Sequence, residues 1–174
     1  EYYAPLKKIK DTDNVTLYDY NLALDLYYYT STWKEQKKIL KKSDLELFMR
    51  DRGSKIDLLN IQWIYRAKKY YNMKPADIYL MLIPIHYKLS TELVKDMVEA
   101  PGVEEFENVV IRTTYARHYN FKQNLTMEQM YADCLHHLYT ADRRKNPYSV
   151  SAINTYLFLK EEEIKKLTTA LECI

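Results

Sequence analysis

Glycine is scarce in this chain: only Gly53 and Gly102 occur among 174 residues, together with five prolines. Tight turns between strands depend on glycine, and the alternation of apolar and polar residues that is typical of half-buried strands is nearly absent. Apolar residues instead recur at steps of three and four, which is the spacing of one helical face. We therefore expect an almost wholly helical, all-α protein.

The overall composition excludes several classes of protein. Lysine and arginine number 26 against 24 aspartates and glutamates, and the net charge of +2 gives no strongly basic face for nucleic acid. No apolar run approaches the ~20 residues of a membrane span, so membrane association is expected only through partner subunits. Cys134 and Cys173 lie far apart in the sequence, which fits reduced thiols in a cytoplasmic protein but leaves a disulfide open.

Caps, prolines and apolar stripes indicate where the helices begin and end. Thr126 and Gln129 match a capping box, with Leu125 and Met130 as its hydrophobic staple. Gly53 predicts a kink or break in a long helix, because glycine costs about 1 kcal/mol relative to alanine inside a helix. Helices are expected over 17–30, 33–40 and 44–71, from Pro75 to Pro84, after the caps Ser90 and Thr126, from Pro101, and as a final pair after Ser149.

The expected domain organisation is simple. Residues 1–13 are predicted to form a poorly ordered lead-in, and residues 14–174 a single all-helical body. The chain stops within an apolar stripe at helical spacing, with no Gly, Pro or cap. This stripe consists of Ile153, Leu157, Ile164, Leu167, Leu171 and Ile174. Together with the start at Glu1 rather than Met, this ending indicates a fragment of a longer natural chain.

Two polar side chains, one turn apart, lie near the start of the helical segment at 56–71, one stripe of which is apolar. Asp57 and Asn60 are one helical turn apart, so their side chains project from neighbouring positions of the same helix. Arg66 or Lys55 could pair with them in a polar network between helices. We favour this structural role over a catalytic one.

The end of the same helix is basic and aromatic. Arg66, Lys69 and Tyr70 lie where cations suit the negative pole of a helix. Arginine and tyrosine are also enriched among the residues that dominate protein interfaces. Docking of Arg66, Lys69 and Tyr70 against a partner protein is therefore one hypothesis, and an ordinary solvated helix end is the other.

Few residues suggest chemistry. The chain lacks G-x-x-x-x-G-K-[ST], and two glycines are too few for such a phosphate-binding loop, so we do not expect it to hydrolyse ATP. Asp133, His136 and His137 could approach a metal from one helical face, but further ligands are not evident and a solvated polar face is preferred. Cys134 falls on an apolar stripe and is interpreted as a core residue. No catalytic, cofactor-binding or metal-binding residue is predicted.

Three blocks, in the same order, resemble one known family. The first is YDYNLALDLYYYTSTW at 18–33, and the second is the D-x-x-N-x-x-x-x-x-R helix at 57–66 with LIPIHYKLS at 82–90. The third is the block at 146–174, which contains the phrase YLFLKEEEI. Together they make the chain similar to the C-subunit family of V-type and A-type rotary ATPases, whose eukaryotic members are known as d subunits.

The resemblance implies both an architecture and a function. Members are built from helical units around a pseudo-threefold axis, which form a funnel on the proteolipid ring that receives the central stalk. By this resemblance the chain is a non-catalytic central-stalk subunit without cofactors, peripheral on the cytoplasmic side of the membrane. It would couple the ATP-turning head to the ion-translocating ring, with stalk and ring subunits as partners. The alternative is a helical scaffold or adaptor that binds peptide or protein partners.

Overall fold

The computed structural model describes residues 3–10, 15–116, 126–145 and 148–172. Within these ranges every regular element is a helix, so the all-α prediction is confirmed. The helices are α1 (Tyr3–Lys10), α2 (Leu17–Ile39), α3 (Lys42–Lys69), α4 (Pro75–Met81), α5 (Thr91–Glu99), α6 (Val103–Ile111), α7 (Met127–Lys145) and α8 (Val150–Glu172).

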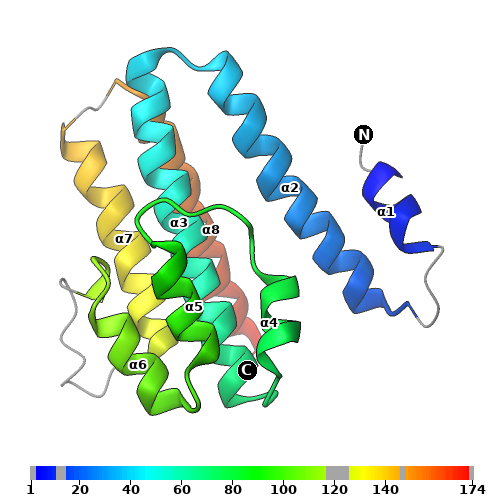
Figure 1. Ribbon diagram of the computed structural model, residues 1–174. Coiled ribbons are helices and arrows are strands. Elements are labelled where there is room, and N and C mark those ends of the chain that lie inside the picture. Colours follow the sequence, from blue (N-terminus) through cyan, green and yellow to red (C-terminus); the bar gives the residue numbers. More distant parts are fainter. Residues whose placement is uncertain (1–2, 11–14, 117–125, 146–147, 173–174) are drawn as a thin grey trace.

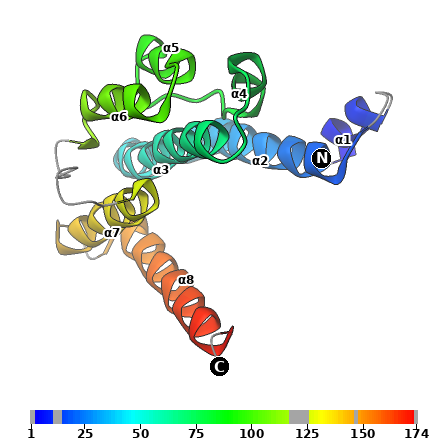
Figure 2. The ribbon, with the colours of Figure 1, turned by 90° about the horizontal axis from the view of Figure 1, so that it is seen from below.

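Helix α3 lies at the centre of the molecule (Figure 1). A short turn joins it to α2, and the two helices then diverge as a long hairpin. Helices α4, α5 and α6 cover one side of α3, while α7 and α8 contact its other side (Figure 2). The main core therefore forms around α3, between α4, α5 and α6 on one side and α7 and α8 on the other.

The main core has large side chains from several of these helices. Ile61 and Ile64 of α3 are fully buried, and they belong to one apolar cluster with Met97 of α5, Phe106 of α6 and Met130 of α7. Burial of each such side chain contributes about 1.5 to 3 kcal/mol. Ile61 and Ile64 of α3 thus belong to the cluster that joins the two sides of the molecule.

Helix α2 is a single helix, which differs from the two helices expected over 17–30 and 33–40. The hydroxyl groups between these ranges are accommodated inside the helix: Thr30 Oγ1 donates to the Leu26 carbonyl at 2.7 Å, and Ser31 Oγ donates to the Tyr28 carbonyl at 3.3 Å. A capping box of Thr16 and Asp19, which was not predicted, begins the helix. None of the residues of α2 is buried.

Gly53 does not break α3, contrary to the kink or break considered from the sequence. The helix is continuous through this position, and Gly53 is buried against the connection that follows α4. A Cβ atom placed on Gly53 would lie 2.6 Å from Cγ of Tyr87. Glycine is therefore required here by a close approach of two segments, not by a turn.

Most predicted caps and prolines mark real helix ends. Ser90 Oγ accepts from the Leu93 amide, Thr126 and Gln129 form both bonds of the capping box, and Pro75 begins α4. The predicted staple to Leu125 lies outside the described residues. Pro101 is not the first helical residue, because α6 begins at Val103 with Gly102 as its N-cap.

The C-terminal region forms one long helix, α8, and not the predicted pair. Its predicted apolar stripe is mostly unburied: Ile153, Leu157, Ile164, Leu167 and Leu171 are 57 to 71% exposed. Ile174 lies outside the described residues. Figure 2 shows that α8 leaves α7 and runs away from the other helices. Among the α8 side chains that the structure describes, Thr155 and Phe158 are buried instead.

A helix also lies within the predicted lead-in. Tyr3–Lys10 forms α1, which contacts α2 and lies away from the core (Figure 1). Tyr3 and Lys7 are exposed on it. The poorly ordered lead-in over residues 1–13 stays a prediction. That residues 14–174 form a single body stays a prediction.

Candidate functional site

Asp57 is the centre of a buried hydrogen-bond network. Its Oδ1 accepts from the amide of Tyr87 at 3.0 Å, and its Oδ2 accepts from the amides of Lys88 at 2.7 Å and Leu89 at 3.2 Å. The phenol of Tyr115 donates to the same Oδ2 at 2.7 Å. The Asp57 side chain is completely buried. One carboxylate of α3 therefore fixes the connection between α4 and α5 and the segment after α6.

Asn60 holds the same connection one helical turn further along α3. Its Nδ2 donates to the carbonyl of Ile83, and its Oδ1 accepts from the amide of Ile83, both at 3.0 Å. The amide side chain thus satisfies both backbone groups of one buried residue, as a neighbouring strand would. This clamp holds Ile83, which lies two residues after the end of α4 at Met81 and directly before Pro84.

The raised pKa of Tyr115 favours a stable hydrogen bond from its phenol to Asp57. Burial raises the pKa of Tyr115 well above its usual value, and the negative charge of Asp57 raises it further. The Tyr115 phenol therefore keeps its proton and donates it to the carboxylate. In the described part of the chain, every buried side-chain nitrogen and oxygen has a hydrogen-bond partner. The Asp57 carboxylate accepts from four donors and is buried from solvent. It therefore serves to hold the connection after α4 and the segment after α6 against α3.

The partners considered from the sequence for Asp57 and Asn60 are engaged elsewhere. Arg66 Nε lies 3.8 Å from Oε1 of Glu128 on α7. Lys55 is half-buried, and burial is the main cause that lowers its pKa, while the Glu161 carboxylate opposes this shift. The predicted pairing of Asp57 and Asn60 with Arg66 or Lys55 is thus replaced by bonds to the backbone and to Tyr115.

Lys69 and Tyr70 form an aromatic and basic group with Tyr65. Lys69 Nζ donates to the Tyr65 phenol oxygen at 2.5 Å and lies 4.9 Å from the centre of that ring and 5.3 Å from the centre of Tyr70. The hydrogen bond to Tyr65 is the main cause that raises the pKa of Lys69. Tyr65 is buried, whereas Tyr70 is 58% exposed.

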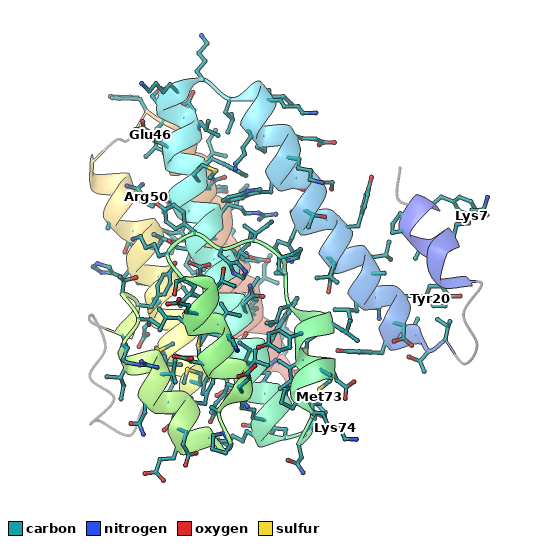
Figure 3. All side chains as sticks on the ribbon, viewed as in Figure 1. Lys7, Tyr20, Glu46, Arg50, Met73 and Lys74 are labelled. Carbon is teal, nitrogen blue, oxygen red and sulfur yellow. The ribbon has the colours of Figure 1, made fainter. Side chains whose placement is uncertain are left out.

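Tyr70 is one of several exposed residues between the end of α3 and the end of α4, a segment that we call the α3–α4 corner. Its members are Tyr70, Tyr71, Lys74, Tyr79 and Leu80. Figure 3 shows Met73 and Lys74 at the end of α3 opposite Glu46, near the start of the helix. Arg66, Lys69 and Tyr70 therefore lie near the same end of the molecule, whereas Asp57 and Asn60 lie inside it.

The other candidates for chemistry do not form a site. Asp133, His136 and His137 are exposed on α7, and no group of three potential ligands in the described residues could hold a metal ion. Burial raises the pKa of Cys134 to about 12, and Asp133 contributes to the shift. The Cys134 thiol is therefore protonated near neutral pH and packs against the main core.

Tyr115 and the amides of residues 87–89 were not predicted as partners of Asp57. Tyr115 is 58 residues from Asp57 along the chain. A single tyrosine among 18 has no distinguishing pattern, and backbone amides leave no mark in a sequence. Only the LIPIHYKLS block, singled out by resemblance, pointed to the connection that these bonds fix.

In the described residues, the helices enclose a polar centre that is buried and fully hydrogen-bonded. The chain belongs to the ATP synthase (C/AC39) subunit family, whose model matches residues 1–174. This is the C-subunit family of V-type and A-type ATPases, so the resemblance is confirmed, and its members are accessory and not catalytic subunits. Comparisons with curated proteins and with solved structures gave no match. None of the described helices is long and apolar enough to cross a membrane.

Proposed function

We propose that this chain is a non-catalytic central-stalk subunit that couples the cytoplasmic ATP-turning head of a rotary ATPase to its ion-translocating membrane ring. The family match over residues 1–174 carries the proposal. In this role the chain forms part of a funnel of helical units. It lies on the cytoplasmic side and is held at the membrane by the stalk and ring subunits.

The way in which α3 is built supports a mechanical role. A coupling subunit must resist twisting, and close-packed interiors transmit strain because they are hard to compress. Helix α3 is continuous over Lys42–Lys69 and contacts helices on two sides. Asp57 and Asn60 add six hydrogen bonds that tie the connection after α4 and Tyr115 to this helix.

Two exposed surfaces suit contacts with other subunits. The first is the α8 stripe, Ile164, Leu167 and Leu171, which are 57 to 71% exposed on one helix. The second is the α3–α4 corner, with Arg66 and Lys69 beside it. Exposed apolar groups rimmed by charged residues mark interaction sites. We assign the docking role of Arg66, Lys69 and Tyr70 to the second surface.

Assembly with purified subunits tests this function. The full-length protein is mixed with the stalk subunits and with the ring, and complexes are separated by size-exclusion chromatography. We expect complexes with both partners. The double variant Ile164→Gln/Leu167→Gln should weaken at least one of them by about tenfold or more, because apolar side chains at an interface centre dominate binding.

A matched control separates this effect from general loss of apolar surface. Ile39→Gln/Ile111→Gln removes two other exposed apolar side chains, on α2 and α6, and should leave both complexes within about twofold. If the unmodified full-length protein binds neither the stalk nor the ring, the proposed coupling role is wrong.

A further inference from the structure

A cleft of about 440 Å³ lies between α2, α3 and the connection that follows α4. Figure 1 shows this connection rising beside α3 on the side of α2. Apolar lining comes from Trp33, Met49, Pro84 and Ile85. The cleft is separate from the α3–α4 corner and from the α8 stripe. It therefore calls for its own explanation.

The lining of the cleft combines apolar walls with positive charge. Lys34 and Lys37 of α2 and His86 of the connection line it, and none of its described lining residues is acidic. Lys37 Nζ lies 5.2 Å from the centre of the Trp33 ring. A ligand that carries negative charge together with an apolar group would complement this cleft.

The positive charge continues beyond the cleft along the hairpin. Residues 34–42 contain five lysines and one carboxylate, Glu35. Lys38, Lys41 and Lys42 are exposed between the cleft and the start of α3. A row of cations matches a chain of carboxylates better than one compact anion.

One wall of the cleft is fixed by the buried centre. Its wall at Pro84, Ile85 and His86 lies between the Asn60 clamp on Ile83 and the Asp57 bond to Tyr87. A wall fixed at both ends loses little freedom when a ligand binds, which favours affinity. The wall at Pro84, Ile85 and His86 is therefore in place before a ligand binds.

We propose that this cleft and the adjoining lysines bind an acidic polypeptide segment that carries an aromatic or large aliphatic side chain. The apolar side chain enters between Trp33, Met49 and Ile85, and neighbouring carboxylates pair with Lys34 and Lys37. A flat bilayer cannot fill a recess of this kind. The small net charge of the chain, +2, does not favour nucleic acid.

Fluorescence anisotropy with a labelled peptide tests the assignment. The probe is a short peptide of glutamates and aspartates around one central phenylalanine, and the control peptide has glutamine and asparagine in their place. The full-length protein should bind the acidic peptide and not its neutral counterpart. Lys34→Gln/Lys37→Gln should weaken binding by about tenfold, the scale of two partly exposed ion pairs.

A charge-matched variant on another helix serves as control. Lys165→Gln/Lys166→Gln removes the same charge from exposed positions of α8 and should change the affinity by less than about twofold. Equal weakening by both double variants would reduce the effect to general electrostatics and overturn the proposal. The proposal would also be overturned if the acidic peptide did not bind, or if phosphatidylserine vesicles bound through Lys34 and Lys37 while the peptide did not.

Discussion

Asp57 accepts four hydrogen bonds in the interior of the protein. The donors are the amides of Tyr87, Lys88 and Leu89 and the phenol of Tyr115. Removing a buried acceptor leaves its donors without partners, which costs about 1 to 3 kcal/mol for each unsatisfied group. The network is therefore a place where one substitution has a large effect on stability.

Asp57→Ala should lower the free energy of unfolding by about 4 kcal/mol, because four donors lose their acceptor and water replaces it only in part. Asp57→Asn keeps one acceptor oxygen and should have a smaller effect. Urea denaturation followed by circular dichroism measures both. Asp96→Ala is the control, since Asp96 makes an exposed ion pair with Arg112 worth about 1 kcal/mol or less. Equal losses at positions 57 and 96 would contradict the assigned role.

Gly53→Ala should destabilise the protein even though alanine favours helices. The added Cβ would meet the Cβ and ring of Tyr87 at 2.6 to 3.0 Å, and such overpacking costs about 1 to 3 kcal/mol. At Gly102 the same change meets only the end of the flexible Glu105 side chain. Thermal denaturation should show a clearly larger drop in Tm for Gly53→Ala than for Gly102→Ala. The reverse order would show that α3 and the connection are not in close contact.

At the scale of elements, two helices that begin with the same kind of cap differ in how much of the core they form. Capping boxes begin both α2, at Thr16 and Asp19, and α7, at Thr126 and Gln129. Helix α7 has buried residues and contacts α3, whereas α2 has none that are buried. The same local interaction therefore contributes differently to global stability.

Thr126→Ala should lower the free energy of unfolding by about 1 kcal/mol, the usual cost of a lost N-cap. Thr16→Ala removes the same group but should mainly increase hydrogen exchange of the first turn of α2, because this helix can open without exposing the main core. Denaturation and hydrogen exchange, applied to both variants, separate the two effects. A global loss from Thr16→Ala as large as that from Thr126→Ala would mean that α2 unfolds together with the core.

At the scale of the whole molecule, the first half of α8 packs against the core and its second half is exposed to solvent. Phe158 is 7% exposed and stacks on Tyr139 with ring centres 4.6 Å apart, while residues 163–172 are all exposed. The outer half therefore contributes surface and not core. This division is what the proposed function needs, since the exposed apolar stripe is free to contact another subunit.

Phe158→Ala should cost about 3 to 5 kcal/mol of stability, as is typical for a large aromatic residue in a core. Ile164→Gln/Leu167→Gln should change the free energy of unfolding by less than about 0.5 kcal/mol, because both side chains are already exposed. Guanidinium denaturation of the three proteins checks both values. A loss above about 2 kcal/mol from the double variant would show that the outer half of α8 is buried in solution.

The sequence by itself determined the helical class, most helix starts and the family. These depend on local signals: two glycines in 174 residues, the caps at Ser90 and Thr126, and the order of three blocks. Each signal acts within a few residues or within one stretch of chain, so it can be read without the rest of the molecule. The polar pair Asp57 and Asn60 was visible for the same reason.

Only the tertiary structure decided which surfaces are covered and what the polar pair binds. Periodicity identifies an apolar face of a helix but not what lies against it, so the stripe of α8 was visible in the sequence while its exposure was not. Asp57 meets Tyr115 and the amides of residues 87–89 through contacts 30 to 58 residues apart in sequence. Such contacts depend on the path of the whole chain, and for that reason residue types and spacings alone did not reveal them.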